Sequence, residues 1–533
     1  MAYYPYGYYT TQATWTSTLS NRLLIDAGLT HIRYYHGFGP GQPAPDGIFN
    51  LVQVTEQSAI QGHAPNFTYR SAATYQENAD RPYYWRASLA YVTGAHSLKV
   101  GYQGSLLKST FLTHVNTNPR EFTNFRFNNG VPNRFSYRLP EWGTANQTNS
   151  MAFYVQEQWT RNRLTLQGAL RFDRATSFSP AEGNGTTATG RWNAAPITFP
   201  RTDGVAFNDI NPRVGVAYDV FGNGKTALKF NLGRYVPVAT SDGLFATNNP
   251  ASRTIVAVNR NWTDSNNNFQ VDCDVTNPAA QVVPGGDVCG AITGDELNFG
   301  RTGASLTQID QDILHGWGVR AYDWQWGLTL QHQLVPRVSA EVSYNRRWWG
   351  NFLVTDNTLI GPSDFDSWAI NVPVDPRLPD GGGYPVTLYA ITPPAAARGA
   401  ANVMTKETDF GDGRTNYWHG VDLTVNARLT SGLTLQGGSS TGRTVTDTCA
   451  TAGSIDSPNL RGCRDVAPFT TALRGLVSYT VPKVDVLVSA TLRSQTPLAL
   501  TANWNVPNLV VQSLLGRLPR VQSLQGRRPS RLP

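Results

Sequence analysis

The acidic and amide residues between positions 264 and 274 have a spacing that could hold a metal ion. In the segment DSNNNFQVDCD, side-chain oxygens stand at Asp264, Asn266, Asn268, Asp272 and Asp274. Alternate residues of a tight curve point the same way, and Ca²⁺ prefers carboxylate and amide oxygens. The segment is not an EF-hand, because Phe269 and Val275 replace the required Gly and Glu. We expect a candidate structural calcium site, with a solvated Asx-rich turn as the alternative.

The four cysteines form two local pairs, Cys273 with Cys289 and Cys449 with Cys463. Each pair lies within a segment rich in Gly, Asp and Pro, which is typical of a loop. Neither pair has the CxxC spacing or the His partners of a zinc site, so thiolate metal binding is the weaker interpretation. We predict two loop disulfides in an oxidising compartment.

The other motifs that could indicate chemistry are incomplete or absent. The segment GNGKT, from Gly222 to Thr226, resembles the end of a phosphate-binding loop, but Asp219 stands where the first Gly is needed, and an alternating strand pattern follows instead of a helix. It is predicted to be an Asn-Gly turn. The eight His residues show no HExxH or HxH pattern, and GxSxG is absent. No pair of carboxylates is singled out as an acid and a base, so we predict no enzyme activity and no cofactor beyond the candidate calcium.

Charge argues against a nucleic-acid partner. The net charge is +7, but the segment from Gln495 onward contains five Arg and no acid, which leaves +2 for the rest of the chain. Charged residues make up only 15% of the 533 residues, while aromatic residues reach 11%. No run of 18 or more apolar residues occurs, which excludes a transmembrane helix.

Apolar and polar residues alternate with a period of two, which predicts strands. Between Met151 and Phe172, for example, Phe153, Val155 and Trp159 share a face, while Gln167 and Arg171 lie on the other. Seven such hairpins are expected, and so about fourteen strands. They lie at Thr14–Thr30, Tyr83–Leu106, Met151–Phe172, Val214–Leu232, Trp324–Tyr344, Val421–Leu435 and Leu473–Leu492.

The connections between these strands alternate in length. Turns within hairpins are a few residues long, as at Val335–Arg337, whereas loops between hairpins reach roughly 30 to 90 residues, which compact soluble β-domains seldom tolerate. An outer-membrane β-barrel has short periplasmic turns, long extracellular loops and strands with alternating lipid-facing and lumen-facing residues. The predicted fold is therefore an all-β, transmembrane antiparallel barrel. Aromatic residues near strand ends fit its interfacial girdles: Trp159, Tyr218, Phe221, Trp348, Trp349 and Tyr479.

Several segments resemble the barrel of TonB-dependent outer-membrane receptors, specifically the Oar-like branch. They are Ala152–Asp173, Asn211–Tyr235, Asn261–Asp274, Gly420–Cys449 and Pro468–Asn508. The resemblance implies a barrel of about 22 strands around a plug, with uptake of a large or scarce ligand driven by the TonB complex. It also implies localisation in the outer membrane, with membrane lipid as a partner. The ligand itself is not identified.

The sequence departs from that pattern at both ends. From the residues before the first hairpin we expect no plug, TonB box or signal peptide, and the C-terminal residues form two near copies that start at Val511 and Val521. We therefore expect residues 1–510 to be a barrel fragment with about 14 of the 22 strands, not competent for transport alone. Residues 511–533 are expected to be an unstructured Arg- and Pro-rich tail from a truncated or frameshifted reading frame.

Two other functions are compatible with an all-β chain. One is a secreted or surface-exposed binding protein of the adhesin type, whose long loops would carry recognition. The other is a glycan hydrolase on a β scaffold, which would need two carboxylates converging in a cleft. Solubility without detergent would favour the adhesin.

Overall fold

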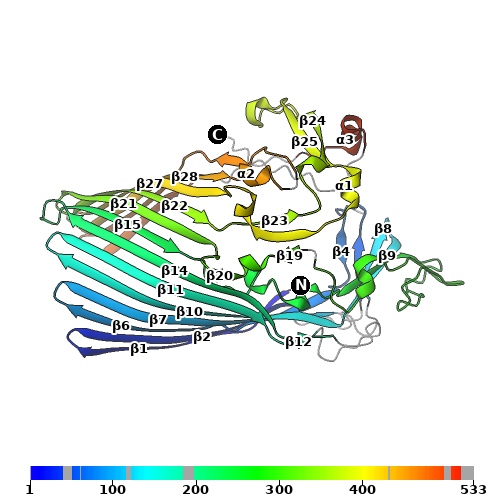
Figure 1. Cartoon of the computed structure of the whole chain (residues 1–533), viewed down its shortest axis with the longest axis horizontal. Helices are drawn as coiled ribbons and strands as arrows, with labels where there is room; N and C mark the ends of the chain where they lie inside the picture. Colours follow the sequence, from blue (N-terminus) through cyan, green and yellow to red (C-terminus); the bar gives the residue numbers. More distant parts are fainter. Residues whose placement is uncertain are drawn as a thin grey trace.

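A computed structural model describes residues 2–39, 51–60, 62–115, 122–183, 197–305, 307–429, 432–455, 457–496, 504 and 506–517. Its main feature is a 17-stranded sheet that curves as one continuous wall (Figure 1). Three members, β5 (Thr74–Asp80), β20 (His315–Trp317) and β29 (Arg464–Val466), are short extensions. The others form the seven predicted hairpins: β1 (Ala2–Ser20) with β2 (Leu23–Gly39), β6 (Tyr83–Thr93) with β7 (His96–Val115), β10 (Glu141–Arg161) with β11 (Leu164–Ser179), β14 (Thr202–Asp219) with β15 (Thr226–Tyr235), β21 (Tyr322–Val335) with β22 (Val338–Gly350), β27 (Thr415–Arg428) with β28 (Leu433–Asp447), and β30 (Thr470–Val481) with β31 (Val486–Ser494).

Each long strand pairs antiparallel with its neighbours in the chain, so the wall is a meander from β1 to β31. Within the described residues, β1 pairs only with β2 and β31 only with β30. The wall is therefore a partial barrel with two open edges. No helix of the described residues is long and apolar enough to cross a membrane.

Register confirms which side chains share a face. Phe153 lies opposite Phe172, Val155 opposite Leu170 and Trp159 opposite Leu166, all on the outward face. Because side chains alternate along a strand, Arg171 points to the concave inner face. Leu170 is 48% exposed and Phe153 is 52% exposed, as expected for side chains that meet lipid rather than a protein core.

Short turns close one end of the wall. At the β14–β15 turn, the Asp219 carboxylate accepts hydrogen bonds from the amides of Gly222 and Gly224, at 3.0 and 2.8 Å. Both glycines have positive φ, which favours glycine over other residues. Thr226 then begins a strand, so GNGKT is a turn, as the sequence predicts. The predicted turn at Thr430 lies outside the described residues.

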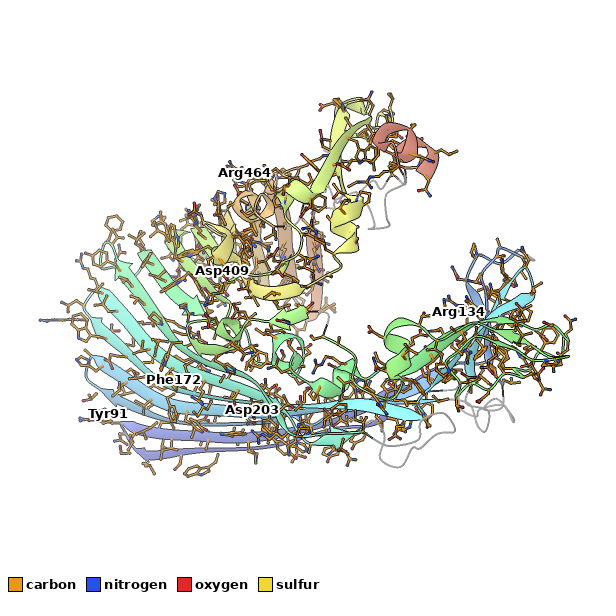
Figure 2. The ribbon with its side chains drawn as sticks, turned by 45° about the vertical axis from the view of Figure 1, so that its right-hand side comes forward. Tyr91, Arg134, Phe172, Asp203, Asp409 and Arg464 are labelled. Atoms are coloured by element: carbon orange, nitrogen blue, oxygen red, sulfur yellow. A yellow bond between two sulfur atoms is a disulfide. The ribbon has the colours of Figure 1, made fainter. Side chains whose placement is uncertain are left out.

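The opposite end of the wall carries the long loops, which build structure of their own. A seven-stranded sheet joins three of them; its members are β3 (Gln53–Glu56), β4 (Phe67–Tyr69), β8 (Phe122–Asn128), β9 (Val131–Arg138), β16 (Ala257–Thr263), β17 (Gln281–Val282) and β18 (Val288–Cys289). Figure 2 shows this loop sheet, with Arg134 labelled, projecting beyond the wall. Smaller sheets are formed by β12 (Glu182–Gly183) with β13 (Thr198–Phe199), by β19 (Thr307–Ile309), β26 (Asn402–Lys406) and β23 (Leu353–Asn357), and by β24 (Phe365–Asn371) with β25 (Pro385–Ile391).

The C-terminal segment differs from the expectation that residues 511–533 lack structure. Residues Asn508–Leu515 form the helix α3, in which Val511 is 1% exposed and packs with Trp368 and Ile370 on the β24–β25 hairpin. Arg517 then pairs with Asp366 at 2.8 Å. Burial of apolar side chains stabilises this segment, so the boundary at residue 511 divides a helix. Residues 518–533 lie outside the described residues.

The orientation of the wall can be tested with one substitution on each face. Leu170→Arg places a charge in the lipid-facing band and is expected to destabilise the barrel wall by about 2–4 kcal/mol. Gln167→Arg, on the same strand but facing inward, is expected to have little effect. Urea unfolding in lipid vesicles, followed by heat-modifiable migration on a gel, measures both. Equal losses for the two variants would contradict the assigned faces.

Candidate functional site: the inner wall and the extracellular loops

The inner face of the wall carries a connected row of charged and amide side chains. Arg171 pairs with Asp173 at 2.9 Å, and the Asn211 amide donates to Asp173 at 2.7 Å. Arg234 donates to the Asn211 side-chain oxygen at 2.8 Å and pairs with Asp209 at 3.2 Å. Asp209 and Asn211 are each only 1% exposed. Acids and bases neutralise one another, so this part of the wall is polar without a strong net charge.

The polar row continues around the wall. Arg347 pairs with Asp323 at 2.9 Å, joining β22 to β21. The Asn345 amide donates to Asp422 on β27 at 2.6 Å. Such a lining suits a water-filled or protein-filled lumen, where polar groups need partners that lipid cannot supply.

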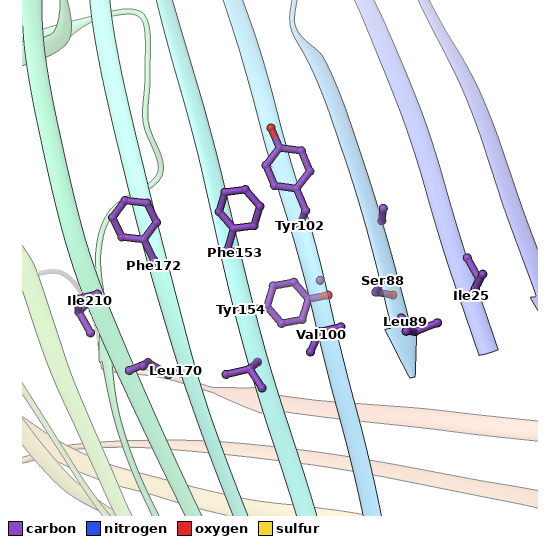
Figure 3. A pocket seen from close by; sticks show the side chains of 13 residues that line it. Ile25, Ser88, Leu89, Val100, Tyr102, Phe153, Tyr154, Leu170, Phe172 and Ile210 are labelled. Atoms are coloured by element: carbon purple, nitrogen blue, oxygen red, sulfur yellow. The ribbon is translucent and has the colours of Figure 1, made fainter. Parts of the chain in front are cut away.

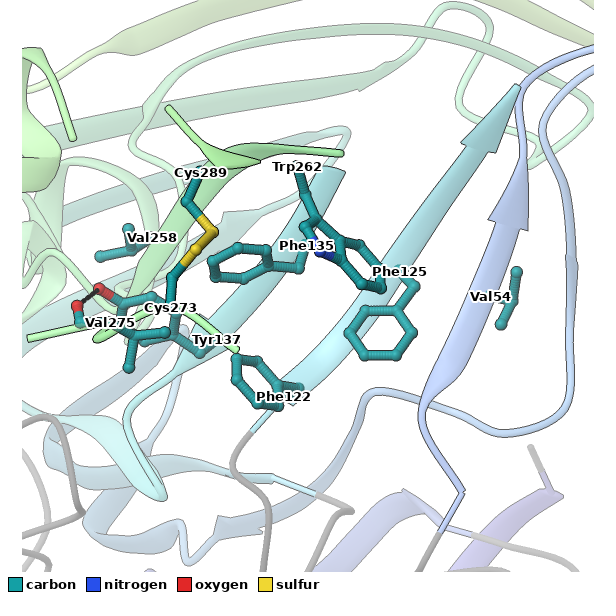
Figure 4. Packing of buried hydrophobic residues seen from close by; sticks show 10 residues of the cluster. All are labelled: Val54, Phe122, Phe125, Phe135, Tyr137, Val258, Trp262, Cys273, Val275 and Cys289. Atoms are coloured by element: carbon teal, nitrogen blue, oxygen red, sulfur yellow. Dashed lines mark hydrogen bonds between the residues drawn. A yellow bond between two sulfur atoms is a disulfide. The ribbon is translucent and has the colours of Figure 1, made fainter. Parts of the chain in front are cut away.

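The loop sheet has its own hydrophobic core, shown in Figure 4. Phe135 is fully buried and lies edge-on to the Trp262 ring, with centroids 6.1 Å apart. The Trp262 indole donates to the Asp287 carboxylate at 2.8 Å, and the Tyr137 hydroxyl donates to the Val275 carbonyl at 3.1 Å. Burial raises the pKa of Tyr137 to about 12, which keeps this donor protonated.

Arg260 is fully buried beneath the loop of residues 273–290. Its guanidinium donates to the carbonyls of Gly290, Asn277 and Ala279 at 2.9, 3.0 and 2.8 Å. Burial lowers the pKa of Arg260, although an arginine stays charged in proteins. One cation thus fixes the path of an irregular loop, a role that the sequence did not reveal.

The predicted disulfide partners lie together in the structure. Cys273 is joined to Cys289 within the core of the loop sheet, as Figure 4 shows, and Cys449 is joined to Cys463 beside α2 (Cys449–Ala452). Thr448 supports the second loop, since its amide and hydroxyl both donate to the Cys463 carbonyl, at 2.8 and 3.0 Å. Both bridges close loops that connect neighbouring hairpins, at the end of the wall opposite the short turns.

The five candidate calcium ligands lie in one tight loop that is bonded internally. The Asp264 carboxylate accepts from the amides of Asn268 and Phe269, at 3.2 and 2.9 Å, and the Asn266 amide donates to Asp272 at 2.7 Å. Asp274 instead accepts from Thr276, whose amide and hydroxyl lower the pKa of Asp274. Among the described residues, no three His, Cys, Asp or Glu side chains are grouped as a metal site. The hydrogen bonds within the loop are those of an Asx-rich turn, and the calcium site stays a prediction.

We propose that this loop takes up calcium weakly, with a Kd of about 0.1–1 mM, in the range of extracellular modules. Titration calorimetry on the full chain should show binding heat that is lost in the Asp264→Asn, Asp272→Asn double variant. The exposed Asp295→Asn change is the matched control and should leave the heat intact. Absence of heat at millimolar calcium would leave the solvated turn as the answer.

Glu56 joins two loops through a buried carboxylate. It is 2% exposed and accepts hydrogen bonds from the amides of Ser58, Asn129 and Gly130, at 2.9, 3.0 and 2.9 Å. Burial opposes its charge, but these amides outweigh burial and hold the pKa below its ordinary value of 4.5. Asn129 and Gly130 form the tip of the β8–β9 hairpin, which Glu56 ties to β3.

The lowered pKa gives the loop sheet a dependence on pH. Because the folded form holds the proton less tightly, the stabilisation by Glu56 is complete above pH 4.5 and is lost as the pH falls through the folded pKa. Glu56→Gln should lower the free energy of unfolding of the loop sheet by about 1–3 kcal/mol at neutral pH. The reason is that the glutamine NH₂ group would face backbone N–H groups that need an acceptor. The protection factors of the Asn129 and Gly130 amides against hydrogen exchange should then fall, and they should no longer decrease as the pH falls below 4.5. Unchanged exchange, matching an Asp295→Asn control, would refute this role.

A cavity of about 540 Å³ lies between two extracellular loops. Its lining includes Tyr384 and Tyr389 on one side and Asn459 and Arg461 on the other. Alternation along β25 explains why Tyr389 lines the cavity. Leu388 and Ala390, on either side of Tyr389 in the sequence, pack toward α3, so the Tyr389 side chain points the other way. The sequence alone could not bring these loops together.

Comparisons with known proteins agree with this architecture. The family model described as "Outer membrane beta barrel domain" matches residues 4–506. No curated protein sequence matches the chain. Among solved structures, the chain is similar to the outer membrane transporter YddB from Escherichia coli, with 11% identity over 92% of this chain and 51% of that chain, and a TM-score of 0.44.

Two further solved structures show similar coverage. The ferric-catecholate import receptor Fiu from E. coli K12 has 12% identity over 92% of this chain and 54% of its own, with a TM-score of 0.43. FpvA from P. aeruginosa, solved with bound pyoverdine, has 12% identity over 91% of this chain and 45% of its own, with a TM-score of 0.42. The chain thus spans about half the length of the structures it matches.

Proposed function

Since the chain belongs to the outer membrane beta barrel domain family, we propose that it forms the barrel wall of a TonB-dependent receptor that takes up a large or scarce ligand. The observation that carries this proposal is the wall itself, which presents apolar residues outward and a connected polar row inward. Long structured loops at one end, with a 540 Å³ cavity between them, give the extracellular contact surface that a receptor needs.

We further propose that the chain belongs to the Oar-like branch of these receptors and works with the TonB complex. The resemblance of segments such as Asn211–Tyr235 supports an Oar-like receptor. The TonB complex would supply the energy for uptake. Cavity lining by Tyr384, Tyr389 and Arg461 supports a ligand with both planar and polar surfaces.

The two open edges of the wall affect whether this chain can transport a ligand by itself. Along β1 and β31, each backbone group left unpaired in hydrocarbon costs several kcal/mol, roughly the full loss of a hydrogen bond. Tilt, shear and strand number are linked in a barrel, so fourteen strands with this register do not close easily on themselves. We infer that both edges pair with further strands before the wall is stable in the membrane, and that the fourteen strands alone do not transport.

Expression of the chain behind an added signal peptide, in a receptor-deficient host, tests both parts. We expect the chain to fractionate with the outer membrane and to give no TonB-dependent accumulation of any ligand. Accumulation that requires TonB would disprove the competence inference but support the receptor. A monomer that stays soluble without detergent would contradict the barrel and favour the adhesin-like alternative.

A further inference from the structure

Three cations stand side by side on the outward face of the wall. The register of β2 with β5 and β6 places Arg33 opposite Arg81, since Tyr34 pairs with Asp80 and His31 with Tyr83. The Arg81 amide in turn donates to the Lys108 carbonyl of β7 at 2.8 Å. All three side chains are exposed. We name Arg33, Arg81 and Lys108 the cation row.

The outward direction of the cation row follows from strand alternation. Side chains an even number of residues apart on a strand lie on the same face. Arg33 is four residues from Leu29 on β2, and Lys108 is eight residues from Val100 on β7. Both Leu29 and Val100 are exposed apolar residues of the lipid-facing band. The residues beside the row face inward instead. Ser109, for example, donates to Asp80 at 2.6 Å on the inner face.

No carboxylate neutralises the row. Within the described residues, none of the three cations forms an ion pair, and the contacts of Arg33 and Arg81 are aromatic. The guanidinium carbons of Arg33 and Arg81 lie 4.5 and 5.2 Å from the centre of the Tyr35 ring. Arg81 also donates to the Tyr35 hydroxyl.

The acids on the same face are engaged elsewhere. Glu77 and Glu141 lie farther along their strands toward the extracellular end, and both pair with His114, at 3.6 and 3.0 Å. Like charges directly opposite on neighbouring strands destabilise a sheet. An anion bound beside the row would offset this repulsion.

The height of the row indicates where that anion lies. Each cation stands eight residues from a residue of the apolar band near the turns: Arg33 from Ile25, Arg81 from Leu89 and Lys108 from Val100. Eight residues of strand span roughly 26 Å, and strands tilted by about 40° rise some 20 Å over that length. Because the short turns face the periplasm, the row lies at the outer margin of the apolar band, where the headgroups of the outer leaflet begin.

An open apolar groove lies nearer the turns than the row and extends from β2, β6 and β7 across the next three strands of the wall. Its volume is about 660 Å³, and Figure 3 shows its lining across β2, β6, β7, β10, β11 and β14. The small side chain of Ala87 leaves room beside Tyr102 and Phe153, whose rings lie 4.8 Å apart. A groove of this kind has room for an acyl chain, and the cations lie farther toward the extracellular end of β2 and β7.

We propose that the cation row and the groove together bind one outer-leaflet lipid with a phosphorylated headgroup. Arginine and lysine form charge-assisted hydrogen bonds with phosphate, and arginine can do so through two N–H groups at once. The aromatic contacts hold the guanidinium groups of Arg33 and Arg81 in place before the lipid arrives. The proposal rests on membership in the outer-membrane family and is independent of ligand uptake.

Native mass spectrometry of the full chain in detergent micelles tests this site. The probes are diphosphorylated lipid A and the same lipid with its phosphates removed. The wild type should bind the phosphorylated form at least about tenfold more tightly, because each charged hydrogen bond contributes on the scale of a tenfold change. The Arg33→Gln, Arg81→Gln, Lys108→Gln triple variant should lose that preference.

A matched control separates the row from general charge. Lys99→Gln removes one cation from β7, but on the inward face, and should leave lipid binding unchanged. Ala87→Trp fills the groove and should weaken binding of both lipids. Unchanged preference in the triple variant would overturn the site, and so would equally tight binding of inorganic phosphate, which has no acyl chain.

Folding of the variants is checked by heat-modifiable migration on a gel. If the triple variant does not fold, lipid binding is measured instead with the Lys108→Gln single variant, which should show a weaker preference for the phosphorylated lipid. The salt dependence of binding by the wild type gives a second test. The affinity for the phosphorylated lipid should fall as salt is added, whereas an affinity that is insensitive to salt would refute the site. Neither measurement depends on transport, so failure here leaves the receptor proposal untouched.

Discussion

The backbone hydrogen bond is the interaction on which the rest of the structure depends. In hydrocarbon no water satisfies an amide or a carbonyl, so each strand must pair along its length with neighbours on both sides. Within the described part of the chain, the hairpins from β1 to β31 meet this requirement along the band of the wall, while β1 and β31 each pair with one strand only. Once pairing is fixed, alternation along β11 and β14 assigns side chains to lipid or to lumen, and the inward polar residues Arg171, Asp173, Asp209 and Asn211 follow.

The hairpins could be predicted from sequence because their information is local. Phe153 and Phe172 are paired across a two-residue turn, so the period of two and the turn residues identify both strands and their register. The loop sheet could not be predicted in this way. Its strand β3 pairs in parallel with β8, and β9 pairs with β16, across separations that leave no local pattern. Arg260 and Glu56 were missed for the same reason, since their partners are backbone groups of distant loops.

The candidate sites also differ in whether their residues are close in sequence or are brought together only by the fold. The cysteine partners and the Asp264 loop are close in sequence, so spacing alone brought their members together. The cavity lined by Tyr389 and Arg461 joins two loops that only the fold brings into contact. The helix α3 is a further case, because its apolar residues have meaning only against Trp368 on the β24–β25 hairpin. Composition alone had suggested an unstructured tail.

Charge placement gives the wall its position in the membrane. Inside, Arg171, Arg234 and Arg347 each have an acidic partner, so the lumen needs no external anion. Outside, the cation row has no acidic partner among the residues that the structure describes. A band of apolar residues alone would fix the depth of the wall only loosely, because lipid is uniform over most of its thickness. Unpaired cations at one margin make the depth definite, since moving them into hydrocarbon costs several kcal/mol, and they select the leaflet where phosphates can meet them.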